Sequence, residues 1–163
     1  MKKHRFLKTL IMAFAFHLCV PVVRAQEASS VKGFSLAMSS EEIEFVARTR
    51  FGLQIVHAGG SLNLYRPGDN PDRTRPIAYF SYGDVDKITC MHFSVHFFSG
   101  QNTLLKDVLR NVRSAYEVKE FLEQKLTGHP VRYYGYTKFG EYVSVHSEGR
   151  RAAWVNFCST RPV

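Results

Sequence analysis

The side chains best suited to chemistry stand on one alternating stretch, residues 87–98, where polar residues alternate with apolar ones. Alternation of this kind predicts a strand with two unlike faces, and it puts His92, Ser94 and His96 on the same face. His92 and His96 would then lie about 13 Å apart, at about 3.3 Å per residue. One zinc ion cannot bind both, because Zn–N bonds are about 2.0–2.1 Å. A zinc site would need His92 together with His146 or a cysteine of a neighbouring strand, and ordinary sheet histidines are the simpler interpretation.

Other catalytic groupings lack their partners. Ser94 is not surrounded by the glycine pattern of a nucleophile elbow. Asp69, Asn70 and Asp72 lack the ligand spacing and the terminal glutamate of a calcium loop. We therefore predict no catalytic residue, no metal site and no cofactor. The alternative that we keep open is a small envelope hydrolase or metal-binding protein that uses the sheet histidines.

The same alternation predicts a binding surface. Residues 131–138, 142–146 and 151–158 also read as strands with one apolar face and one polar, aromatic face. Large amphipathic rings are enriched at the centres of protein interfaces. The predicted binding residues on this face are Tyr134, Tyr136, Tyr142, His146, Trp154 and His92. The alternative is an ordinary half-exposed sheet face, or one covered by a loop.

The loop 66–76 is the second candidate surface, because it carries Arg66, Arg73 and Arg75 among proline, glycine and other turn-forming residues. Its arginines would suit an acidic site on a partner, and its prolines would limit the conformational entropy lost on binding. As a solvated connection between strands, the loop needs no function.

Short helices and hairpins must position these surfaces. Ser39 and Glu42 have capping-box spacing, and apolar residues at helical spacing follow them as far as Gly52. Residues 53–65 predict a hairpin with a Gly-Gly turn, and residues 77–82 predict another strand. Residues 104–112 favour a helix.

A further helix is expected to begin at a second capping box, Ser114 to Glu117, and to end at Gly128. The elements together predict one α+β domain, residues 33–163, with short helices packed on one face of an antiparallel sheet. Alignment of the two capping boxes suggests a tandem helix-then-strands repeat, residues 33–100 and 101–163. Amphipathic helices also resemble one another for physical reasons alone, so duplication stays one of two interpretations.

Residues 1–25 have the pattern of a bacterial-type signal peptide: a basic start, a short apolar run and small residues at a cleavage site after Ala25. The run is too short for a resident membrane helix. A periplasmic or secreted protein with a flexible leader, residues 26–32, is therefore predicted. Cys19 does not follow a convincing lipobox, and a retained N-terminal anchor is the alternative.

Removal of the predicted signal peptide would change the net charge of the protein. The chain has 22 Lys and Arg and 14 Asp and Glu, and five of the basic residues but no acidic ones lie in residues 1–25. The remainder carries 17 − 14 = +3, which argues against a nucleic-acid partner. Its two cysteines, Cys90 and Cys158, predict one disulfide in an oxidising compartment, with two separate buried thiols as the alternative.

Residues 33–43, which read GFSLAMSSEEI, together with Phe51 and Gly52, resemble the opening segment of two groups of small envelope proteins. These are the SmpA/OmlA-like outer-membrane assembly lipoproteins and the β-lactamase inhibitory protein and its relatives. The resemblance implies short helices on an antiparallel sheet and action by binding other proteins rather than by catalysis. Ala37 stands where glycine is usual, and no functional residue of these families maps onto a matched motif position of this chain. We therefore expect a non-enzymatic module that binds another protein, either an inhibitor or an envelope assembly factor.

Overall fold

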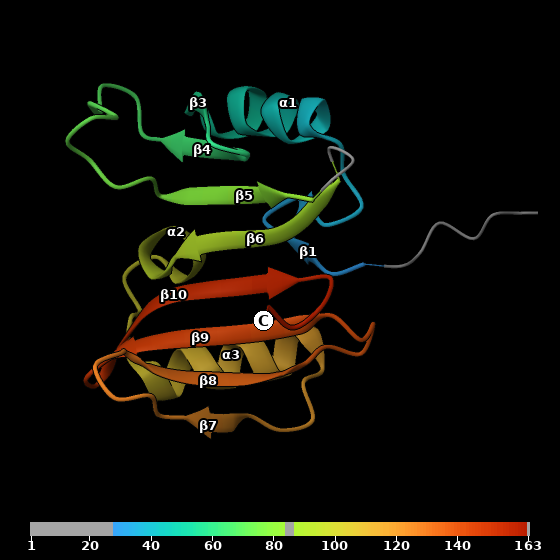
Figure 1. Ribbon diagram of the computed structural model, residues 1–163, viewed down its shortest axis with the longest axis vertical. Helices are drawn as coiled ribbons and strands as arrows, with labels where there is room; N and C mark the ends of the chain where they lie inside the picture. The colour runs from blue at the N-terminus through green and yellow to red at the C-terminus, as the bar shows by residue number, and fades with distance from the viewer. Residues whose placement is uncertain (1–27, 84–86, 163) are drawn as a thin grey trace, which may run out of the picture.

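A computed structural model describes residues 28–83 and 87–162, so the predicted signal peptide lies outside the described residues. The described residues form one large antiparallel sheet, one two-stranded sheet and three short helices (Figure 1). The large sheet contains β3 (Gln54–Ala58), β4 (Ser61–Tyr65), β5 (Ala78–Tyr82), β6 (Ile88–Ser94), β7 (Leu122–Gln124), β8 (Val131–Tyr136), β9 (Tyr142–Glu148) and β10 (Arg151–Cys158). The other elements are β1 (Ser30–Val31), β2 (Phe34–Ser35), α1 (Ser40–Phe51), α2 (Val95–Ser99) and α3 (Leu105–Tyr116). The α+β prediction is confirmed at this level, with the sheet as the dominant part.

The large sheet is built from two meanders that meet at its centre. Its strand order is β3-β4-β5-β6-β10-β9-β8-β7, and every neighbouring pair is antiparallel. The first meander follows α1 and the second follows α3, and their last strands, β6 and β10, pair with each other (Figure 1). Each meander of four strands thus follows a helix.

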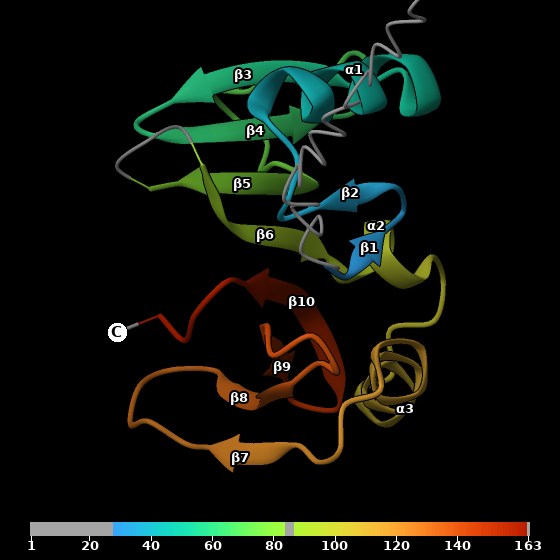
Figure 2. The same cartoon turned by 90° about the vertical axis from the view of Figure 1, so that its right-hand side faces the viewer.

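One face of the sheet carries the core. The helices and the β1-β2 sheet lie on that side of the strands, and the chain ends on the other side (Figure 2). Phe34, Phe80 and Phe93 are fully buried there, with ring centroids of Phe34 and Phe80 5.2 Å apart. Burial of large aromatic rings supplies much of the hydrophobic stabilisation of a small domain.

The capping box predicted at the start of α1 is present. The Glu42 N–H donates to Ser39 Oγ at 3.3 Å, and the Ser39 N–H donates to Glu42 Oε2 at 2.8 Å. Gly52 ends the helix in the left-handed region at φ 62°, which glycine adopts without a steric penalty. Ile43 and Ala47 face the core.

The predicted helix that begins at Ser114 is wrong, because Ser114 lies near the end of α3. That helix stops at Glu117, which has a φ of 52°, and the chain then returns to the sheet as β7. Leu122 is 47% exposed and Leu126 is 53% exposed, so their helical spacing does not correspond to a buried face. Burial of Val118 and pairing of β7 with β8 override the local helix signal.

The strand predicted over residues 87–98 is wrong at its end. β6 stops at Ser94, whose Oγ accepts a hydrogen bond from the Phe97 N–H at the start of α2. A helical turn lets the adjacent rings of Phe97 and Phe98 both pack against the core, whereas a strand would turn one of them away. His96 is therefore exposed on α2 and does not share a face with His92.

The predicted flexible leader, residues 26–32, is part of the fold at its end. β1 pairs with β2, and Val31 is buried. The Ser29 N–H donates to the buried carboxylate of Glu141 at 2.9 Å, which ties this segment to the turn before β9. Residues 26 and 27 lie outside the described residues.

Replacement of Phe34 by alanine tests the core directly. We expect Phe34→Ala to lower the free energy of unfolding by about 3–5 kcal/mol, because it leaves a cavity among buried rings. Denaturant unfolding measures this loss. Phe45→Ala is the matched control, since Phe45 is 67% exposed on α1, and it should change the free energy by less than about 0.5 kcal/mol. Equal losses in the two variants would contradict this core.

Candidate binding surface

The face of the sheet opposite the helices is polar and aromatic, and we call it the polar face. The register of β6 and β10 sets Cys158 opposite Cys90, Asn156 opposite His92 and Trp154 opposite Ser94. The next strands continue this face with Tyr142, Ser144 and His146 on β9, Arg132, Tyr134 and Tyr136 on β8, and Tyr79 and Ser81 on β5. Side chains from both meanders therefore share one surface.

The predicted disulfide between Cys90 and Cys158 is present. The two residues are direct partners on neighbouring antiparallel strands, with their Cα atoms 4.0 Å apart. The bond crosses the junction of the two meanders, so it holds the register on which the polar face depends.

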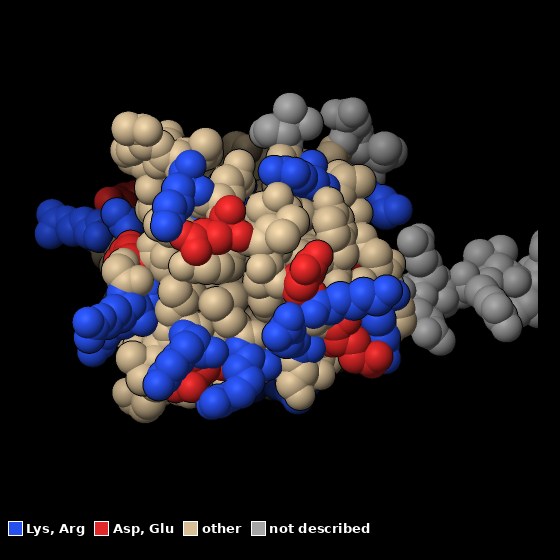
Figure 3. All heavy atoms as spheres, turned by 90° about the horizontal axis from the view of Figure 1, so that it is seen from below, with Lys and Arg blue, Asp and Glu red and all other residues tan. Residues whose placement is uncertain are grey.

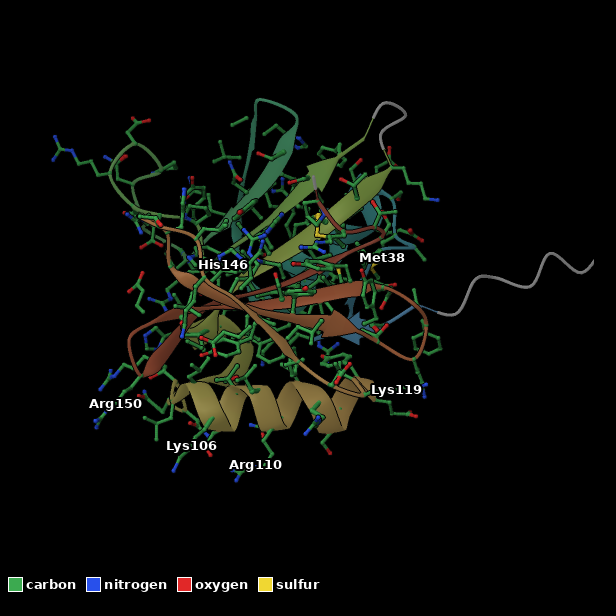
Figure 4. The ribbon with its side chains drawn as sticks, turned by 60° about the horizontal axis from the view of Figure 1, so that its bottom comes forward. Met38, Lys106, Arg110, Lys119, His146 and Arg150 are labelled. Atoms are coloured by element: carbon green, nitrogen blue, oxygen red, sulfur yellow. A yellow bond between two sulfur atoms is a disulfide. The ribbon has the colours of Figure 1, made fainter. Side chains whose placement is uncertain are left out.

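A hollow of about 410 Å³ lies on the polar face. It is lined by Arg75, Tyr79, His92, Arg132, Tyr142, Ser144, His146, Trp154, Asn156, Cys158 and Pro162. In Figure 4 the labelled His146 lies beyond the strands from α3, whose labelled Lys106 and Arg110 point away from the sheet. A hollow of this size is in the range that accommodates a small ligand or side chains of a partner.

Asn156 is the centre of a hydrogen-bond network in the wall of the hollow. Its Oδ1 lies 3.0 Å from His92 Nδ1, and its amide nitrogen lies 3.2 Å from Ser144 Oγ and 3.1 Å from His146 Nε2. An amide oxygen accepts and an amide nitrogen donates, so His92 carries its proton on Nδ1 and His146 accepts at Nε2. A proton on His146 Nε2 would place this N–H against the N–H of the Asn156 amide, so that two donors would face each other without an acceptor. The network therefore requires His146 to be neutral.

Both histidines have strongly lowered pKa values. Burial is the main cause that lowers the pKa of His92 to about 4, and His146 lowers it further, while the hydrogen bond to Asn156 opposes the shift. Burial also lowers the pKa of His146 to about 4, with a smaller contribution from the positive charge of Arg132. At neutral pH both rings are uncharged, in agreement with the network.

Aromatic rings form two groups on the polar face. Tyr79 stacks on His92 with centroids 4.0 Å apart and meets Trp154 edge-on at 5.6 Å. Tyr142 is stacked with Tyr134 at 5.9 Å and meets Tyr136 edge-on at 6.0 Å. These contacts restrict ring rotation, so the rings are held in place before any partner binds.

The predicted binding residues are thus divided between the hollow and its surroundings. Tyr142, His146, Trp154 and His92 line the hollow, whereas Tyr134 and Tyr136 lie beside it on β8. Tyr136 is 50% exposed. Of the loop arginines, only Arg75 lines the hollow. Arg66 and Arg73 are exposed elsewhere on the loop.

Tyr79 and Asn156 also line the hollow, although they are not among the predicted binding residues. The alternation of residues 77–82 is a signal that places Tyr79 and Ser81 on the polar face, and the disulfide register places Asn156 beside His92. The central position of Asn156 on β10 depends on His92 of β6 and on Ser144 and His146 of β9. No local sequence pattern predicts hydrogen bonds between side chains of different strands.

The described residues hold no group of three or more histidines, cysteines, aspartates or glutamates close enough to bind a metal ion. His92 and His146 instead share Asn156 as a hydrogen-bond partner. Within the same residues, no helix is long and apolar enough to cross a membrane.

Known proteins provide no assignment for this surface. Comparisons with family models, with curated proteins and with solved structures find no match to the chain. The resemblance to small envelope proteins thus rests on residues 33–43, Phe51 and Gly52 alone. The function has to be inferred from the geometry of the site.

The lowered pKa values predict a pH-dependent stability. His92 and His146 are each neutral in the folded protein down to about pH 4, but each takes up a proton near pH 6.5 in the unfolded chain. The unfolded state then binds more protons between these values, so the free energy of unfolding is greatest above pH 6.5 and falls towards pH 4. For His92 the loss approaches about 3 kcal/mol below pH 4. His146 is less buried and contributes less.

Urea unfolding at several pH values measures this dependence. His92→Gln keeps a polar side chain that does not titrate, so it should flatten the decline between pH 6.5 and pH 4. His129→Gln is the control, since His129 is exposed and lies outside the network. A decline that is the same in the parent protein and His92→Gln would contradict the assigned state of His92.

Proposed function

We propose that this protein is an exported, non-enzymatic module that binds another protein through the polar face. The observation that carries the proposal is the set of large aromatic side chains on the side of the sheet away from the helices. Tyr134 and Trp154 are only half-buried there, and Tyr136 is half exposed. Aromatic rings in such positions contribute a large contact area when a partner covers them.

The fixed geometry of the face supports binding. Its side chains are attached to paired strands, and a network of hydrogen bonds and ring contacts holds several of them in place. A surface that is ordered before binding loses less side-chain entropy when the complex forms. The polar face therefore has both the chemistry and the rigidity of an interface centre.

Export is the second part of the proposal. The signal-peptide pattern of residues 1–25 and the disulfide between Cys90 and Cys158 support a periplasmic or secreted location. An inhibitor of an extracytoplasmic enzyme and an envelope assembly factor both fit this description. The resemblance of residues 33–43 to envelope proteins supports the same two classes.

A pull-down from envelope and culture-medium extracts tests the proposal, with residues 26–163 as bait. The test variant replaces Tyr134, Tyr136 and Trp154 by alanine. The matched control replaces Phe45, Lys106 and Arg110 by alanine. These residues lie on helices α1 and α3, on the other side of the sheet. Circular dichroism and cooperative unfolding establish that all three baits are folded.

We expect one protein to be captured by the parent and by the control but not by the polar-face variant. With that protein purified, the variant should bind about 100-fold more weakly or worse, because removal of each interface anchor costs about 1–2 kcal/mol or more. Equal affinity of the parent and the polar-face variant would contradict the proposal.

A further inference from the structure

The hollow on the polar face has an excess of positive charge. Arg75 comes from the loop before β5 and Arg132 from β8, and no aspartate or glutamate is among the lining residues. Within residues 28–83 and 87–162, neither guanidinium has an ion pair or a side-chain hydrogen bond. His92 and His146 are neutral, so they do not add to this charge and offer no negative counter-charge.

The wall of the hollow also contains a hydrogen-bond donor, the indole N–H of Trp154, and an indole can only donate. A ligand with two acceptor oxygens would accept from this N–H and pair with the guanidinium groups at the same time. The Tyr142 hydroxyl is buried out of reach of solvent, so it adds no donor for a ligand in the hollow.

We infer that the hollow is a carboxylate pocket that receives an aspartate or glutamate side chain of the partner protein. This inference rests on the proposed function, since the same face makes the contact. Planar guanidinium groups bind carboxylates through paired N–H···O bonds, and the aromatic walls reduce competition from water. The hollow volume leaves room for neighbouring atoms of the partner beside the carboxylate.

The charge pattern elsewhere favours a protein partner over a polyanionic surface. At the α3 and β7 end of the molecule, Lys and Arg side chains have Asp and Glu side chains among them (Figure 3). Arg110 there is paired with Asp107 at 2.8 Å, and Lys138 is paired with Glu117. Nucleic acids and anionic membranes are bound by dense basic patches. Two arginines that line one aromatic hollow instead match a single acidic side chain.

The chain has a single tryptophan, and it lines the hollow. Tryptophan fluorescence of the purified, oxidised protein therefore reports on this site alone. The probe is N-acetyl-aspartate methylamide, and the matched control probe is N-acetyl-asparagine methylamide, which differs by an amide in place of the carboxylate. We expect a saturable fluorescence change with the acid, weakened by added salt, and no saturable change with the amide.

Charge-removing variants identify the residues responsible. Arg75→Gln and Arg132→Gln should each weaken binding of the acid by about tenfold or more, the loss expected for one charge-assisted contact. Arg66→Gln is the matched control, because it removes the same charge from the same loop outside the hollow. Unchanged binding in Arg132→Gln, equal binding of acid and amide, or tighter binding of inorganic phosphate than of the acid would overturn the assignment.

The captured partner separates this inference from the function on which it rests. A partner that is lost with the aromatic triple variant but binds Arg75→Gln and Arg132→Gln at full affinity would leave the proposed function standing and overturn the carboxylate pocket. Binding of the acid probe that requires both arginines, with no partner captured, would support the pocket and contradict the proposed function alone.

Discussion

The pairing of β6 with β10 is the interaction on which the rest of the structure depends. It joins two meanders into one sheet, and the Cys90–Cys158 disulfide holds it at one register. The same register sets Asn156 opposite His92, the pair at the centre of the hydrogen-bond network. A slip of one residue would turn every side chain of one strand to the opposite face, placing polar groups in the core and apolar groups in the hollow.

From this pairing, the two faces of the sheet acquire different roles. Phe93 and Phe157 on the inner face pack under the helices, whereas Trp154 and Asn156 on the outer face meet side chains of β5 and β9. The inner face supplies the stability that lets the outer face hold neutral histidines and uncompensated arginines. A partner protein that brings a carboxylate to this face would pair with those arginines.

Alternation of residue types predicted most of the strands and the members of the polar face, because the strand period is a local property. The capping box at Ser39 was equally informative, since its hydrogen bonds lie within one turn. The signals at Ser114 and after Ser94 were misleading, because packing of Val118 and of the Phe97 and Phe98 rings decided those segments. Local patterns could not predict the network around Asn156 either, because its side chains come from separate strands.

Hydrogen exchange measured on the oxidised protein by NMR tests the central junction most directly. If β6 and β10 unite the two meanders, their paired amides should open only with global unfolding and exchange about 100-fold or more slowly than those of the edge strands β3 and β7. Exchange in β6 and β10 as fast as in the edge strands would contradict the account. It would mean that the two halves separate readily and that no stable polar face spans them.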